Sequence, residues 1–211
     1  TKCLQSFFFY VHLSQKLQLM DTKLNAATSI SKLFTPLSGP MLELFADILI
    51  RTELRKNELL FKEGEVSDQI GYVYKGMVRQ FYFKNNKDLT EHFTCNGNLF
   101  ICIESFLKQI PRPLKVEAIE PSIIYGIPHG PLEELSRQHF EIEYLYRKML
   151  ESSLILSQKK ADSLRFESAR ERYERLIKTQ PEIIKRAPLR QIASLLEMTP
   201  ETLSRVRGGN F

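Results

Sequence analysis

The sequence contains no tryptophan, few cysteines and few histidines. Three cysteines without a C-x-x-C pair predict no disulfide framework, and they are typical of a protein from a reducing cytosol. An iron–sulfur cluster needs about four cysteine ligands at cluster spacing, so the three scattered cysteines argue against an iron–sulfur sensor protein. The four histidines show neither H-x-H nor H-x-x-x-H spacing, so no metal site is predicted. The residues concerned are Cys3, Cys95 and Cys102, and His12, His92, His129 and His139.

Long apolar runs are also missing. No stretch approaches the roughly 18 apolar residues that a membrane-spanning helix needs. The apolar segment 7–13 is not followed by the small-residue cleavage site of a signal peptide. We therefore expect a cytoplasmic protein without a membrane partner. Residues 1–21 are predicted to be an unstructured extension, and our hypothesis is that residues 1–19 arise from a misplaced translation start.

Positive charge, by contrast, is concentrated at one end of the chain. The 211 residues carry a formal net charge of +5. Residues 158–211 hold 12 Lys and Arg against 7 Asp and Glu, whereas residues 1–157 hold 18 of each sign. A basic segment on a neutral body indicates an anionic partner such as nucleic acid, although a solvated basic face has the same composition.

The periodicity of the apolar residues predicts an α+β fold. Residues 22–56 are expected to form short amphipathic helices. From Leu59 the period is two residues, and short runs rich in β-branched and aromatic residues alternate with turn residues. Many short antiparallel strands at this spacing predict a β-roll of the jelly-roll type, with the N-terminal helices, over residues 22–131. The expected strands are 59–65, 69–76, 77–83, 89–95, 114–118 and 122–128, with turns at Gly64, Lys75-Gly76, Asn85-Asn86, Asn96-Gly97 and Pro121.

Residues 132–166 contain neither glycine nor proline, and we expect them to form one long helix. Five residues of this helix, four of them apolar, follow one another at alternating steps of three and four and so form a heptad-like stripe on one face. Such a stripe favours a homodimer formed through the helix, and packing onto the chain's own β-roll is the alternative. The stripe consists of Ile142, Leu145, Met149, Ser152 and Leu156.

Residues 167–211 are predicted to form a helix-turn-helix domain at the end of the chain. Thr199 can cap the final helix through its hydroxyl, and Pro200 fits the first helical position, where an N–H is not needed. The apolar Leu203 and Val206 then form the inner face of that helix. The expected helices before it are 168–178 and 189–196, with a break at Pro181 between them.

The outer face of the final helix carries charge. At 100° per residue, Glu201 and Arg205 lie opposite the apolar face, and Ser204 lies on the flank. Arginine at such a site can bond guanine O6 and N7, and glutamate can accept from cytosine N4. We therefore expect this helix to read bases in the major groove of double-stranded DNA; an ordinary helical hairpin with a surface ion pair is the alternative. The predicted phosphate contacts are Thr199, Thr202, Arg207, Lys185, Arg186 and Arg190.

Two motifs resemble the CRP/FNR family of bacterial transcription regulators. "FKEGEVSDQIGYVYKGMVRQFY" (61–82) is similar to the strand–Gly–strand–Gly signature of that family, and "IASLLEMTPETLSRVR" (192–207) matches its helix-turn-helix. Glu201, Ser204 and Arg205 fall on the family's base-reading positions, and the Ser-Arg pair looks more like the FNR branch. The resemblance implies a homodimeric, sequence-specific DNA-binding regulator with RNA polymerase as a partner, and no enzyme.

This chain departs from the family pattern at two places in the C-terminal domain. Glu197 stands where the family usually has a turn glycine. If this position needs a positive φ, a residue other than glycine costs on the order of 1 kcal/mol there. The short link 180–189 also leaves little room for a β-hairpin wing, so a winged-helix-like domain with a reduced wing is expected.

The nucleotide cassette of the resembling family is eroded here. Ile101-Cys102 replace the Gly-Glu pair that supplies a close-approach amide and a ribose contact, and Arg112-Pro113 replace Arg-Ser. The resemblance therefore implies an effector domain that has lost cyclic AMP binding, with no cofactor and an unknown effector. Glu104, Ser105 and Arg112 are candidates for a repurposed pocket, and surface residues on a degenerate loop are the alternative reading.

Two further function classes remain open from the sequence. A jelly-roll metalloenzyme of the cupin type would need a cluster of histidine and carboxylate ligands, whereas the roll offers His92 beside Glu91 and a distant His129. A stand-alone cyclic-nucleotide-binding module is the other alternative, and the eroded cassette disfavours it.

Overall fold

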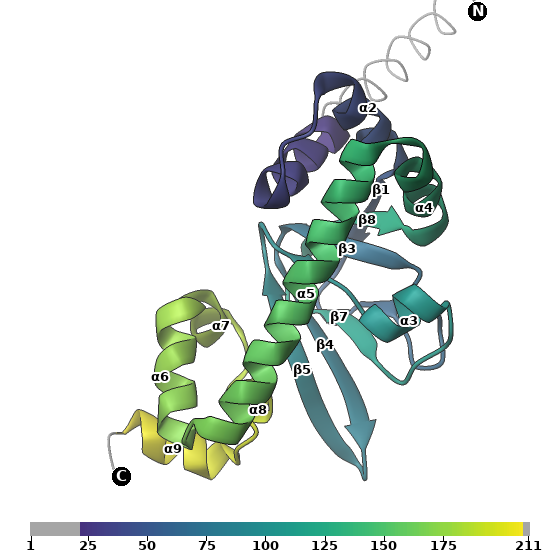
Figure 1. Cartoon of the computed structure of the whole chain (residues 1–211). Helices are drawn as coiled ribbons and strands as arrows, with labels where there is room; N and C mark the ends of the chain where they lie inside the picture. Colours follow the sequence, from purple (N-terminus) through teal and green to yellow (C-terminus); the bar gives the residue numbers. More distant parts are fainter. Residues whose placement is uncertain (1–21, 209–211) are drawn as a thin grey trace, which may run out of the picture.

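The computed structural model describes residues 22–208, and the predicted extension 1–21 lies outside them. The strands form two four-stranded antiparallel sheets, with the orders β1-β8-β3-β6 and β2-β7-β4-β5. The two sheets face each other as a β-roll (Figure 1), and the predicted α+β fold is confirmed. The strands are β1 Ile50–Leu54, β2 Leu59–Phe61, β3 Gln69–Lys75, β4 Met77–Lys84, β5 Lys87–Cys95, β6 Leu99–Phe100, β7 Lys115–Ala118 and β8 Ser122–Pro128.

The interior of the roll follows from the period-two pattern of its strands. Val73 and Ile124 from one sheet are buried together with Val78 and Val116 from the other. The predicted turns are confirmed, and Gly76 shows why one of them needs glycine. Its φ is 97°, and a Cβ there would lie 2.2 Å from the Oγ of Ser122. Any side chain at this position would therefore collide with the neighbouring strand.

The N-terminal helices and the helices after the roll share one apolar core. They comprise helical residues 22–34, α2 Gly39–Ile48, α4 His129–Gln138 and α5 Phe140–Phe166. Ile30, Phe45, Leu132 and Ile142 from these four helices are all buried in one cluster with Tyr125 of β8. This cluster fixes α5 across the front of the roll in Figure 1.

Two predictions about these elements are wrong. Residues 132–166 are not one helix, because His139 has φ −133° and ψ 112° and separates α4 from α5. The His139 N–H still bonds the Leu135 carbonyl, and the His139 carbonyl accepts from the Ile142 and Glu143 amides, so His139 contributes hydrogen bonds to the end of α4 and to the start of α5. Residues 50–54, expected to be helical, instead form β1, which pairs along its whole length with β8.

The predicted dimer stripe divides into two parts. Ile142, Leu145 and Met149 are buried against the chain's own roll and N-terminal helices, so for these three residues the alternative reading of the stripe is the correct one. Further along α5, Ser152 is exposed and Leu156 is 51% exposed. The part of α5 that extends beyond the N-terminal helices therefore carries exposed apolar side chains.

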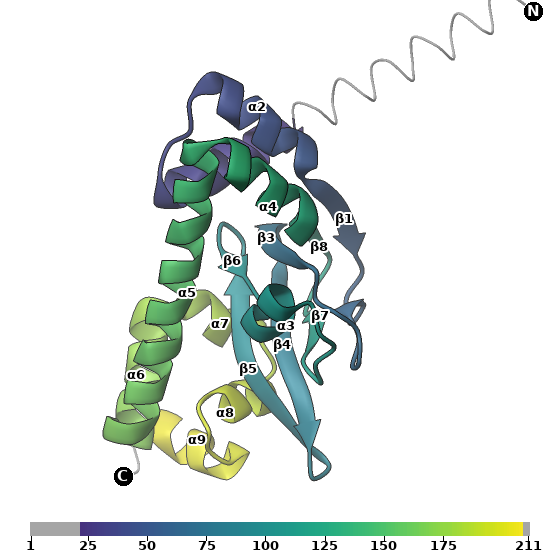
Figure 2. The same cartoon turned by 45° about the vertical axis from the view of Figure 1, so that its right-hand side comes forward.

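Four short helices form the C-terminal unit: α6 Ala169–Thr179, α7 Pro181–Arg186, α8 Leu189–Leu195 and α9 Pro200–Arg207. The sequence predicted a break at Pro181 but not the helix α7 that begins there. No strand occurs between α7 and α8, so the wing, which was expected to be reduced, is missing from this link. Figures 1 and 2 show this unit beside α5 and the β4–β5 hairpin, at the end of the roll farthest from the N-terminal helices.

Candidate nucleic-acid interface

The helices α8 and α9 meet in a tight turn. Ala193 is fully buried where they approach, and its carbonyl accepts a 3.0 Å bond from the Met198 amide. Glu197 adopts φ 50°, so the turn needs the left-handed backbone that glycine would supply without strain. The expected strain at this residue is therefore present.

The start of α9 is capped as predicted. The Thr199 hydroxyl accepts a 3.2 Å bond from the Thr202 amide, and Pro200 occupies the first turn. Leu203 and Val206 are buried against α6 and α8. The cap and the two apolar residues thus fix how α9 is rotated about its own axis.

This rotation exposes the three predicted base-reading residues. Glu201, Ser204 and Arg205 are all on the solvent side of α9. The Glu201 side chain bonds its own amide and the Thr199 hydroxyl, which lowers the pKa of its carboxyl group and keeps it ionised. The outer face of α9 therefore presents a carboxylate, a hydroxyl and a guanidinium group next to one another.

The predicted phosphate contacts have different surroundings. Arg190 and Arg207 are exposed, and the exposed Lys185 lies 2.9 Å from the Glu182 carboxylate. The hydroxyls of Thr199 and Thr202 bond each other at 3.2 Å. Three of these cations and the start of α9 are therefore accessible to a polyanion.

Arg186 differs from these cations, because it lies in the contact between α7 and the roll. Its guanidinium group is ion-paired with Glu120 and donates a 3.3 Å bond to Asn96. Its side chain is only 20% exposed. Arg186 thus stabilises the contact between the two units and is poorly placed for the predicted phosphate contact.

The helix-turn-helix unit packs directly on the roll. Met77, Phe93 and Ile119 of the roll are buried in the same cluster as Leu176 and Ile192. The Ser194 Oγ of α8 accepts a 2.8 Å bond from the Thr90 amide and donates a 3.0 Å bond to the Asp88 carbonyl, both on β5. These contacts across the two units were not predicted.

The bond to Ser194 is available because β5 is the edge strand of its sheet, and the residue after Thr90, Glu91, is a bulge in this strand. Gln80 of β4 pairs with His92 and Phe81 pairs with Thr90, so Glu91 is an extra residue on β5. The Glu91 carbonyl and carboxylate both accept 2.8 Å bonds from Lys160 of α5. Neighbouring residues of β5 therefore bond both α5 and α8.

A cavity of about 1060 Å³ lies between the roll, α5 and the start of α7. Glu104, Ser105 and Arg112, the candidate effector residues, all line it. The Arg112 guanidinium group lies 2.9 Å from the Glu104 carboxylate. The buried Ser105 hydroxyl accepts from the Ser67 amide and donates to the Ile110 carbonyl. Ser105 thus has a structural role, and Glu104 already neutralises Arg112.

Residues 51–139 match the family model of the cyclic nucleotide-binding domain. FixK2 from Bradyrhizobium japonicum has a TM-score of 0.62 at 21% identity, over 77% of this chain and 84% of FixK2. The c-di-GMP responsive global regulator CLP from Xanthomonas campestris has a TM-score of 0.63 at 18% identity, over 82% of this chain and 91% of CLP. The chain has the architecture of the CRP/FNR regulators.

The catabolite activator protein from Thermus thermophilus shares this CRP/FNR architecture, with a TM-score of 0.52 at 20% identity over 82% of this chain and 83% of that protein. No curated protein sequence matches the chain. The predicted resemblance is confirmed for the fold, and assignment to the FNR branch stays a prediction.

Residues 22–208 contain no group of three or more His, Cys, Asp or Glu side chains of the kind that the cupin-type alternative requires. Within the same residues, no helix has the length and apolar character of a membrane span.

Proposed function

We propose that the chain is a homodimeric transcription regulator that binds double-stranded DNA sequence-specifically through α9. The observation that carries the proposal is the orientation of this helix. Leu203 and Val206 are buried, so Glu201 and Arg205 lie on the face that can enter the major groove. Arginine that bonds guanine bidentately supplies about 1–3 kcal/mol of discrimination between bases.

The charge distribution supports the same proposal. Lys185, Arg190 and Arg207 are exposed on the C-terminal unit, and Arg207 ends α9 itself. Phosphate contacts from such residues position a recognition helix without reading sequence. Release of counterions from DNA then makes the affinity fall as salt concentration rises.

The proposed homodimer uses the outer side of α5. At 100° per residue, Phe140, Leu154 and Ile155 lie on the side of the helix away from the buried Ile142. They are 78%, 68% and 54% exposed. A two-fold dimer through this face would present two copies of α9 to half-sites about 34–36 Å apart. As a regulator, the dimer would act in the cytoplasm, with RNA polymerase as a partner. Transcription in vitro with purified polymerase would test this partnership.

The effector part of the proposal is a domain that does not bind cyclic AMP. Ile101 and Cys102 occupy the positions of the expected Gly-Glu pair, and Cys102 is buried. Neither side chain can provide a carboxylate for a ribose. Together with the ion pair between Arg112 and Glu104, this leaves no evident anchor for a cyclic phosphate.

The proposal is tested by equilibrium binding of the full chain to labelled duplexes between 50 and 200 mM salt. Lys185→Ala should weaken binding to all sequences similarly and reduce the slope of log affinity against log salt by about 1. Lys108→Ala, on the roll and far along the chain from this unit, is the control and should change neither. Binding without any salt dependence, or an equal effect of the two variants, would contradict phosphate contact by the C-terminal unit.

A further inference from the structure

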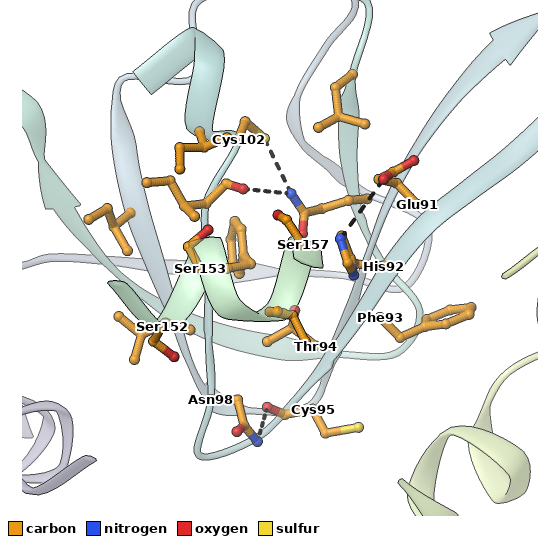
Figure 3. Close-up of a pocket in the computed structure, with 18 of the residues that line it drawn as sticks. Glu91, His92, Phe93, Thr94, Cys95, Asn98, Cys102, Ser152, Ser153 and Ser157 are labelled. Carbon is orange, nitrogen blue, oxygen red and sulfur yellow. Dashed lines mark hydrogen bonds and ion pairs between the residues drawn. The ribbon is translucent and has the colours of Figure 1, made fainter. Parts of the chain in front are cut away.

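The cavity beside α5 extends from the eroded cassette to the DNA-binding unit. Its lining includes Ile101 and Arg112 at one end and Gln180 and Glu182, at the start of α7, at the other. Between these ends, strand β5 faces one turn of α5 (Figure 3). A molecule in this cavity would therefore contact both the roll and the unit that carries α9.

Positive charge is scarce in the lining. Arg112 is its one lysine or arginine, and it is ion-paired with Glu104. The lining carboxylates Glu91 and Glu182 are paired in turn with Lys160 and Lys185, respectively. A phosphate group placed here would meet three carboxylates and no uncommitted cation, and burying an anion without a partner is costly.

His92 adds no positive charge at neutral pH. Burial, and then the neighbouring Lys160, lower the pKa of its imidazole from 6.5 to about 4, while Glu91 opposes them. The neutral imidazole offers one donor and one acceptor. The cavity is therefore suited to a ligand that makes hydrogen bonds without carrying negative charge.

The cavity also contains hydroxyl groups that make no hydrogen bond within residues 22–208. Ser153 and Ser157 lie one turn apart on α5, with Ser152 beside them, and Thr94 lies on β5. Figure 3 shows the serines on the turn of α5 in front of the strand that carries His92 and Thr94. Each hydroxyl can donate one bond and accept others, so this wall can match several polar groups of a ligand.

We infer that this cavity binds an uncharged, nucleoside-sized ligand between the serines of α5 and strand β5, and that the ligand bridges the roll and the DNA-binding unit. The inference rests on the effector part of the proposed function. A volume of about 1060 Å³ leaves ample room for such a molecule. Met149, Leu156 and Phe100 supply apolar walls for a ring system.

Residues 90–92 of β5 connect the cavity to the helix-turn-helix unit. His92 lines the cavity, and the preceding residue, Glu91, binds Lys160 of α5. Thr90, which precedes Glu91, binds Ser194 of α8. A ligand that fixes His92 and contacts Gln180 would stabilise one placement of the C-terminal unit over others. A ligand shifts such an equilibrium only by its difference in affinity for the two placements.

The test compares adenosine, cyclic AMP and AMP by titration calorimetry on the full chain without DNA. The three probes share base and ribose and differ in negative charge. We expect adenosine to bind at least about tenfold more tightly than either anion, which is about 1.4 kcal/mol. Stronger binding of cyclic AMP, or no binding of adenosine, would overturn the inference.

Variants locate the site and separate it from DNA binding. Ser153→Leu, which fills the cavity, and Ser157→Ala, which removes one hydroxyl, should each weaken adenosine binding, whereas Gln138→Leu on the exposed side of α4 should not. Hydrogen exchange should slow at residues 90–94 and 179–182 when adenosine binds; protection confined to the roll would contradict a bridging ligand. Because no DNA is present, these results are independent of whether α9 reads bases.

Discussion

Glu197 is the residue at which the helix-turn-helix departs most from an unstrained backbone. Its φ of 50° is a left-handed conformation that costs a residue with a Cβ on the order of 1 kcal/mol. Glu197→Gly should therefore raise the free energy of unfolding by roughly 0.5–1 kcal/mol, measured by urea denaturation.

Glu197→Ala is the matched control for this change. It removes the carboxylate and keeps the Cβ, so it should leave the strain in place and give no such gain. An equal gain from both variants would attribute the effect to the charge of Glu197, which lies near Tyr82, and not to its backbone.

His92 should make stability depend on pH. Its folded pKa of about 4 lies below the ordinary value of 6.5, so protons bind the unfolded chain first as pH falls. Stability should thus be constant above pH 6.5 and decline between pH 6.5 and 4. The loss should be roughly 1–3 kcal/mol, below the full value of the shift because about a quarter of the side chain is exposed.

His92→Gln should remove most of this decline in denaturation measurements across the same pH range. His139→Asn, at the junction of α4 and α5, removes a histidine outside the cavity and should leave the decline in place. A decline that persists in His92→Gln would show that carboxylates elsewhere, and not His92, cause it.

Residue patterns predicted the orientation of α9 because the cause is local. The Thr199 cap and two buried side chains on an eight-residue helix are sufficient to expose Glu201 and Arg205. The role of Ser194 could not be predicted in this way. Its partners Asp88 and Thr90 lie about a hundred positions earlier, on the edge strand β5, and only the tertiary fold brings them beside α8.

Among the helices, α5 has the exposed apolar side chains that we propose to form the dimer contact. Leu154 and Ile155 are 68% and 54% exposed on its outer side, where they would be buried between two copies of the chain. Ile155→Glu should shift the chain from dimer to monomer in sedimentation experiments, because an unpaired carboxylate would be buried.

Leu107→Glu is the corresponding control, on the short helix α3 (Ile103–Lys108) of the roll. Leu107 is 46% exposed on the roll, so this variant should remain dimeric. A wild-type chain that is monomeric at every concentration, or a dimer that Ile155→Glu does not weaken, would contradict the proposed face.

The same helix shows where periodicity fails as a guide. A stretch without glycine or proline permits a long helix, but it does not require one. At His139 the chain instead turns so that Leu132 of α4 and Ile142 of α5 enter the same core. Likewise, the apolar pattern of residues 50–54 fits a helix or a strand, and pairing with β8 decides between them.

In the molecule as a whole, the C-terminal helical unit is attached to the roll as well as to α5. Ser194, Arg186 and the apolar contact through Phe93 all cross between the two units. A ligand in the cavity next to these contacts would therefore act on the position of α9. In the proposed dimer, this arrangement would couple ligand binding to the spacing of the two α9 helices.

The proposal that the outer face of α9 reads bases can be tested by selecting bound duplexes from a random pool. The wild-type chain should enrich a two-fold symmetric sequence, and Arg205→Ala should lose preference at one position of each half-site while keeping the rest. Arg170→Ala, whose guanidinium group pairs with Glu174 on α6, should select the wild-type sequence. No enrichment by the wild-type chain, or the same selected sequence with Arg205→Ala, would contradict the account.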